Sequence, residues 1–127
     1  MKEKLVIVGR YDMGYESVEL ILREEIGGEF IFIPEKGHIA RIKIGADQEK
    51  WHQIVNVLLH EAQELAYQRI GGRWTPAYDM ANDHAAYLFS LSHTQFTEAT
   101  ARVAEFVAGC LPDLEKAWKK WKKEQVK

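Results

Sequence analysis

The residues best placed to do chemistry stand together in the segment His60-Glu61-Ala62-Gln63-Glu64. His60 and Glu64 are four residues apart, so on an α-helix their side chains lie one above the other on the same face. An imidazole nitrogen and a carboxylate oxygen at that spacing can bind one metal ion together. Glu61 points to the side of this face. The spacing therefore predicts a metal site on a helix.

A metal site needs a further protein ligand besides this pair. The candidates are His84, His93 and Glu98, with Asp83 behind them. His84 and His93 are nine residues apart, which places them on opposite faces of a strand and about half a turn out of phase on a helix. We therefore expect only one of the two to join the site. We favour His93, because it precedes an expected helix and lies near Glu98.

The surrounding sequence resembles that of small zincin-type metallopeptidases. The resemblance rests on the strand Ile42-Lys43-Ile44, on the helical approach from Trp51 to Leu58-Leu59-His60-Glu61, and on residues 96–112, which look like a helix that carries a third ligand. It covers roughly residues 39–112. The family's HExxH pattern is here HExxE, with Glu64 in place of the second histidine.

The resemblance implies a Zn²⁺ cofactor, with His60 and Glu64 among its ligands and Glu61 as the catalytic general base that activates a metal-bound water. A carboxylate is an ordinary zinc ligand. It lowers the effective positive charge of the metal, however, so the bound water becomes less acidic. The departure from the family pattern therefore bears on catalysis more than on the fold.

A long amphipathic helix over residues 47–70 must position this motif. Asp47 is a good N-cap, and Gly71-Gly72 is a typical helix end. The apolar residues follow the i, i+3, i+4, i+7 pattern of one buried face. They are Trp51, Ile54, Val55, Leu58, Leu59, Ala62, Leu65, Ala66 and Ile70.

His60 falls about opposite this apolar stripe, with Glu64 close beside it. Three interpretations fit that placement: a solvated face, the wall of a cleft that holds a metal, or a structural hydrogen-bond network.

The first 45 residues alternate between apolar and polar positions, as strands do. The expected strands are Leu5–Val8, Ser17–Glu25, Glu29–Ile33 and Ile39–Ile44, with a two-residue turn at Gly27-Gly28. We predict an antiparallel β-meander of three to four strands. A competing interpretation has Ser17 capping a short helix that ends at Gly27, which would give a βαβ start.

The remainder of the chain is expected to be mainly loop and helix. Residues 73–83 read as a loop, and Ala85–Leu91 as a strand or a short helix. A helix is expected over Gln95–Leu111, and Pro112 would open a last helix at its first turn. The predicted fold class is therefore α+β, with the meander followed by the long helix and two C-terminal helices. We expect one domain over residues 1–127, mainly β in 1–45 and mainly α in 46–127.

The C-terminal helix, residues 113–126, is basic and amphipathic. Residues 113–127 carry six lysines and three acidic residues, a net charge of +3, so the remainder of the chain carries −2 − 3 = −5. Such a helix could contact an anionic surface, a nucleic acid or a protein partner. Alternatively, it docks Leu114, Trp118 and Trp121 on the core and leaves its lysines in water.

The overall composition excludes several classes of protein. The 127 residues carry 17 Lys and Arg against 19 Asp and Glu, which argues against a chain that binds nucleic acid over its whole surface. The single cysteine, Cys110, excludes a disulfide within the chain and a zinc site built from several thiolates, and its apolar neighbours favour a core thiol. No apolar run is long enough to span a membrane or to act as a signal peptide. We therefore expect a cytoplasmic protein.

Two functions of different classes follow. The first is a small zincin-like, metal-dependent hydrolase or peptidase with Glu61 as base, whose strand Ile39–Ile44 binds an extended peptide by strand addition. The alternative is a non-catalytic accessory or interaction module, of the kind that phages and mobile elements encode, on a degenerate metallopeptidase-like scaffold. In that case a peptide or protein partner would contact exposed aromatic residues such as Trp74 and Trp121, and Trp74 and Tyr78 could rim a groove or contact the partner.

Overall fold

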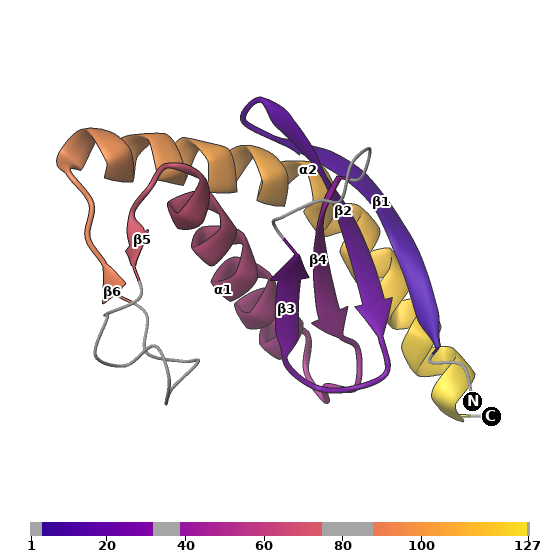
Figure 1. Ribbon diagram of the computed structural model, residues 1–127. Helices are drawn as coiled ribbons and strands as arrows, with labels where there is room; N and C mark the ends of the chain where they lie inside the picture. Colours follow the sequence, from indigo (N-terminus) through magenta and orange to yellow (C-terminus); the bar gives the residue numbers. More distant parts are fainter. Residues whose placement is uncertain (1–3, 32–38, 75–87, 127) are drawn as a thin grey trace.

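A four-stranded sheet and two long helices are the main elements of the protein, in a computed structural model that describes residues 4–31, 39–74 and 88–126 (Figure 1). The strands are β1 (Leu5–Met13), β2 (Glu16–Arg23), β3 (Gly28–Ile31) and β4 (Ala40–Gly45). The helices are α1 (Trp51–Arg69) and α2 (His93–Val126), and a short ladder between them joins β5 (Arg73–Trp74) to β6 (Leu88–Phe89). The predicted α+β class is confirmed.

The sheet is mixed, so the prediction of an antiparallel meander is wrong. Its strand order is β1-β2-β4-β3, and β2 pairs with β4 in parallel, from Val18 opposite Ala40 to Arg23 opposite Gly45. β1–β2 and β3–β4 are antiparallel. The competing βαβ start is also wrong, because residues 16–23 form a strand.

The predicted two-residue hairpin at Gly27-Gly28 does not form, because β4 lies between β2 and β3. The connection over residues 24–27 instead crosses the end of β4. The amide of Gly45 donates to the carbonyl of Gly27 at 2.6 Å, and the amide of Ala46 donates to that of Arg23 at 2.8 Å. The carboxylate of Asp47 accepts from the amide of Glu25 at 2.8 Å. Residues 45–47 therefore satisfy the polar backbone groups of this crossing.

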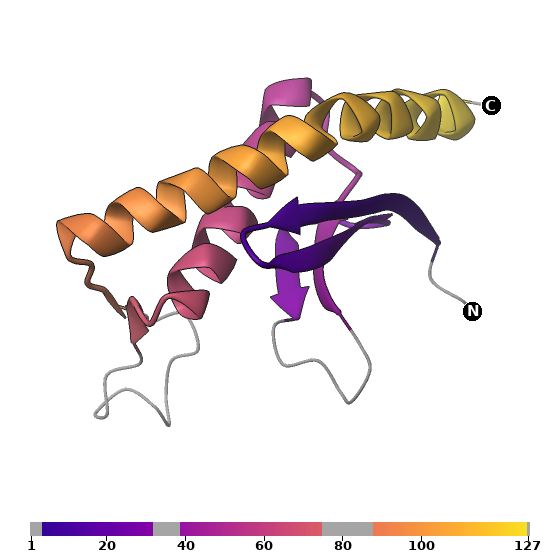
Figure 2. The same cartoon turned by 90° about the horizontal axis from the view of Figure 1, so that it is seen from above.

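Both helices lie on one side of the sheet (Figures 1 and 2). The side chains of β2 and β4 that face the helices are apolar and buried. They pack with residues from the buried face of α1 and from α2. This core includes Val18, Leu20, Leu22, Ile42, Ile44, Ile54, Leu58, Leu65, Phe106, Leu114 and Trp121.

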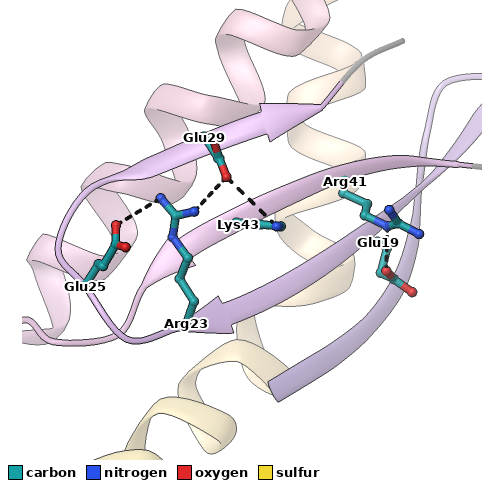
Figure 3. Close-up of polar contacts among 6 residues, drawn as sticks. All are labelled: Glu19, Arg23, Glu25, Glu29, Arg41 and Lys43. Atoms are coloured by element: carbon teal, nitrogen blue, oxygen red, sulfur yellow. Dashed lines mark hydrogen bonds and ion pairs between the residues drawn. The ribbon is translucent and has the colours of Figure 1, made fainter. Parts of the chain in front are cut away.

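The other face of the sheet carries charged side chains in ion pairs (Figure 3). Glu29 lies between two cations, with Arg23 Nη1 at 2.6 Å and Lys43 Nζ at 4.0 Å from its Oε1. Arg41 Nε lies 3.1 Å from Glu19 Oε1. Charged and apolar residues thus alternate along β4, and along β2 except at Ile21, which is buried among the charged residues of this face.

The long helix predicted before Gly71-Gly72 is confirmed, but its start is not at Asp47. α1 begins at Trp51, where the side chain of Gln53 accepts a hydrogen bond from the amide of Lys50 at 2.8 Å. Asp47 instead binds Glu25 and, at 3.2 Å from its Oδ1, the indole Nε1 of Trp121. Two donors distant in the sequence therefore bind the Asp47 carboxylate, which local sequence rules would place at the N-cap of α1.

Residues 93–126 form one helix of 34 residues, where two were predicted. Pro112 lies inside α2 and does not start a new helix. A proline removes one helical hydrogen bond, but packing on both sides of it holds the flanking turns in place. The two halves of α2 run in slightly different directions (Figure 2), as expected of a helix bent at a proline. The first half lies along α1 and the second along β1.

The basic end of α2 is docked on the core by its tryptophans, as one of the two interpretations predicted. Leu114 is fully buried, and Trp118 and Trp121 are 7% and 2% exposed. Trp118 Nε1 donates to the carbonyl of Ala46 at 3.1 Å. The prediction that Trp121 is an exposed contact residue is therefore wrong. Within the described residues, neither helix is both long and apolar enough to cross a membrane.

We expect Gly45→Ala to destabilise the fold strongly, because the crossing leaves no space for a side chain. A Cβ atom at Gly45 would lie 2.6 Å from the carbonyl carbon of Glu25 and 2.7 Å from that of Ile26. The loss in free energy of unfolding should be about 2–3 kcal/mol, measured by urea denaturation. Gly109→Ala is the matched control, because its Cβ would meet nothing closer than 3.7 Å and alanine favours a helix. Equal stabilities of the two variants would contradict the prediction.

Candidate metal centre

The three candidate metal-site residues of the motif on α1 differ in how far they are exposed to solvent. The side chain of His60 is 69% exposed, that of Glu64 14%, and that of Glu61 only 7%. The difference between His60 and Glu61 follows from the helical wheel. His60 lies opposite the apolar stripe, and Glu61 is turned about 100° from His60, toward that stripe. The predicted exposure of His60 is confirmed. Glu64 is more buried than a solvated face would leave it.

The two carboxylates converge on one ring nitrogen. His60 Nδ1 lies 2.7 Å from Glu61 Oε2 and 3.9 Å from Glu64 Oε2. One ligand atom from each of the three residues lies within 4.8 Å of the other two. In the described part of the chain, these three residues are the one group of this kind.

This spacing fits a metal ion bound by His60 and Glu64. Zn–N and Zn–O bonds are about 2.0–2.2 Å long, so two donor atoms on one ion lie at most about 4.4 Å apart. The 3.9 Å between His60 Nδ1 and Glu64 Oε2 is inside that limit. The 2.7 Å contact with Glu61 is instead the length of a hydrogen bond. A ring nitrogen that binds a metal carries no proton, so an ion bound at His60 Nδ1 would replace this hydrogen bond and leave the Glu61 carboxylate beside the ligand pair as a proton acceptor.

Burial raises the pKa of Glu61 above its ordinary value, and the charges of Glu64 and Glu29 act in the same direction. The hydrogen bond and the charge of His60 lower it by less. A buried carboxyl group that holds its proton more tightly than usual, beside a histidine, has the properties of a general acid or base.

β3 approaches this site closely because its first residue is a glycine. A Cβ atom on Gly28 would lie 2.6 Å from Val57 Cγ1 and 3.0 Å from Glu61 Cγ. β3 is an edge strand of the described sheet, where its partner is β4 alone. The buried side chain of Glu61 therefore lies close to β3, an edge strand of the described sheet.

Sequence reasoning missed Arg73, which contacts the site from β5. Its Nε lies 3.2 Å from Glu64 Oε1, and its side chain is 11% exposed. The turn after α1 brings it back along the helix, with the amide of Gly72 donating to the carbonyl of Tyr67 at 2.8 Å. No helical spacing rule relates Arg73 to Glu64, because they lie on different elements. The one signal in the sequence was a cation directly after the helix-ending glycines.

The structure does not bring His93 to the other candidate ligands. His93 is the exposed first residue of α2. Gln95 Nε2 donates to the carbonyl of Ile70 at 3.1 Å, which places this end of α2 at the C-terminus of α1. Ile70 is ten residues beyond His60, or about 15 Å along the helix.

Of the other residues predicted for the site or for partner contacts, some lie within the part of the chain that the structure describes and some lie outside it. Glu98 is exposed and pairs with Arg102 at 2.8 Å, so it is engaged elsewhere. His84, Asp83 and Tyr78 lie outside the described residues, as does the side chain of Trp74.

Cys110 is fully buried, and burial raises the pKa of its thiol to about 12. The thiol is therefore not an activated nucleophile.

Comparisons of the chain with protein-family models, with curated proteins and with solved structures found no match in any of the three.

We expect Glu61→Gln to be more stable than the natural chain at neutral pH. The folded protein holds the Glu61 proton to higher pH than the unfolded chain, so this residue lowers stability as pH rises from about 4.5 through the raised pKa of the folded state. Glutamine does not titrate and still accepts the hydrogen bond from His60. The difference in unfolding free energy should therefore grow across that window and then level off. Urea denaturation with a chelator from pH 4 to 8 measures it.

The matched control is Glu98→Gln, whose carboxylate is exposed on α2. We expect no comparable growth of the stability difference in that variant. A stability of Glu61→Gln that falls relative to the natural chain as pH rises would contradict the sign of the pKa shift.

Proposed function

We propose that the protein is a metal-dependent hydrolase with a zincin-like site, in which His60 and Glu64 bind a divalent ion such as Zn²⁺ and Glu61 is the general base. The observation that carries the proposal is the convergence of His60, Glu61 and Glu64 within 4.8 Å of one another. The metal would supply an activated water and polarise the bond to be cleaved. The residues of the chain would hold the ion and accept the proton.

Glu61 suits the role of the base because of its surroundings. It is buried, it contacts His60, and burial raises its pKa above the ordinary value, so that it holds a proton more tightly than an exposed carboxylate. A third protein ligand belongs to the proposal. His84 is the predicted candidate that remains for that position, since His93 begins α2 at the far end of α1.

An extended peptide is the substrate that the neighbouring sheet edge suits. The predicted role of Ile39–Ile44 in strand addition is wrong, because β4 is paired on both edges, with β2 and with β3. In the described sheet the free edge near Glu61 belongs to β3. A peptide added there would lie beside the general base.

We expect the purified chain to bind about one equivalent of Zn²⁺ or Co²⁺ by isothermal titration. His60→Ala and Glu64→Ala should each weaken binding at least about 100-fold, because each removes a ligand. Glu61→Gln should keep the metal and lose peptide hydrolysis. His52→Ala is the matched control, an exposed histidine two turns earlier on α1 that should leave affinity unchanged. Metal binding that survives both alanine variants would refute the site.

A second candidate is the interaction module, and an apolar groove between α1 and α2 favours it. The groove encloses about 500 Å³ and has few polar groups in its lining. Phe96 at its rim is 51% exposed and Leu59 36%. Exposed apolar surface of this kind is typical of sites that bind a partner. The lining includes Leu59, Gln63, Tyr67, Phe96, Thr100, Val103, Ala104 and Val107.

If this groove is open to partners, it should bind the apolar dye anilinonaphthalene sulfonate in the native protein. Phe96→Ser should remove most of the dye fluorescence, because it removes the largest exposed side chain of the lining. The control is Tyr15→Ser, which removes a fully exposed aromatic ring in the connection between β1 and β2. Equal fluorescence of the natural chain and Phe96→Ser would exclude the groove as the binding surface.

A further inference from the structure

Arg73 and Glu64 form a nearly buried ion pair at the edge of the candidate metal centre. Arg73 Nε lies 3.2 Å from Glu64 Oε1, and the two side chains are 11% and 14% exposed. The other oxygen of the same carboxylate, Oε2, lies 3.9 Å from His60 Nδ1. One carboxylate therefore faces a cation on one side and the proposed metal position on the other.

The charge of Glu64 cannot be considered without this cation. In the HExxH pattern the second ligand is a neutral imidazole, whereas here it is an anion, which lowers the effective charge of the bound metal. A guanidinium group stays protonated at any pH that the folded protein tolerates, and a pair this far from water is only weakly screened. The Arg73–Glu64 pair therefore has a net charge near zero.

We propose that Arg73 is the charge-compensating partner of Glu64, so that the pair presents to a metal ion the net charge of a neutral ligand. This inference rests on the proposed function. It explains how an HExxE site can keep the electrostatics of a site with two histidines. The cost is a weaker hold on the metal, because the cation repels the ion that Glu64 attracts.

Two other roles of Arg73 would have the opposite effect on metal affinity. If the ion pair only ties β5 to α1, its loss would loosen the end of the helix and weaken metal binding. If Arg73 only fixes the orientation of Glu64, its loss would also weaken binding, as is usual for groups that hold a ligand in place. Charge compensation alone predicts tighter binding when Arg73 is neutralised.

The test compares Zn²⁺ affinity in three variants by competition with a chromophoric chelator. Arg73→Gln should bind Zn²⁺ about tenfold more tightly than the natural chain, because it removes the repulsion and keeps polar side-chain atoms near Glu64. Arg73→Lys keeps the charge, and its affinity should stay within about threefold of the natural one. Arg69→Gln is the matched control, since Arg69 pairs with Glu16 at 2.7 Å, away from the site.

The outcomes separate this inference from the proposed function. A natural chain that binds no metal would overturn the proposed function. Metal binding by the natural chain, with equal or weaker binding by Arg73→Gln, would overturn the inference alone. Circular dichroism checks the fold of each variant. If Arg73→Gln does not fold, the lysine variant decides: affinity like that of the natural chain supports charge compensation, and a loss of more than about tenfold contradicts it.

Discussion

The structure depends on a three-residue segment, Gly45–Asp47, that lies under the connection from β2 to β3. Backbone amides of this segment donate hydrogen bonds to the carbonyls of Arg23, Glu25 and Gly27. A glycine is needed at position 45 because the backbone of the crossing connection touches it there. The same segment receives α2, since the indoles of Trp118 and Trp121 donate to Ala46 and Asp47. It also leads directly into α1. The order of the sheet, the start of the first helix and the docking of the second are thus fixed at one place.

This constraint explains which parts of the fold were predictable from the sequence. The identity of most elements follows from local periodicity, and the strands of residues 16–23 and 40–45 and the helix before Gly71 were found on that basis. Strand order depends on contacts between distant residues, and the turn-forming pair Gly27-Gly28 gave no sign that β4 would lie between its flanking strands. Asp47 is a good helix cap by local rules, but Glu25 and Trp121 take its oxygens. Pro112 is a good helix start by local rules, but packing on both sides keeps α2 continuous.

In the candidate site, too, local spacing predicted the residues that share one helix and did not predict those that come from other elements. His60, Glu61 and Glu64 lie on one helix, so their spacing alone placed them together. Arg73 and Gly28 reach the site from β5 and β3, through contacts that no pattern within the helix encodes. The structure places the predicted ligand His93 away from this group for a related reason. Proximity to a helix start says nothing about where that helix lies, and α2 begins at the far end of α1.

The position of α1 makes the chemistry of the motif possible. Its N-terminal end follows Asp47, and its C-terminal end is held by Gln95, so the helix has little freedom to turn about its axis. A rotation toward solvent would hydrate Glu61 and return its pKa toward the ordinary value, whereas a rotation toward the core would bury His60. The observed orientation keeps His60 exposed enough to meet a ligand and Glu61 buried enough to raise its pKa above the ordinary value. The packing that fixes the helix therefore also sets the proton affinity of its central carboxylate.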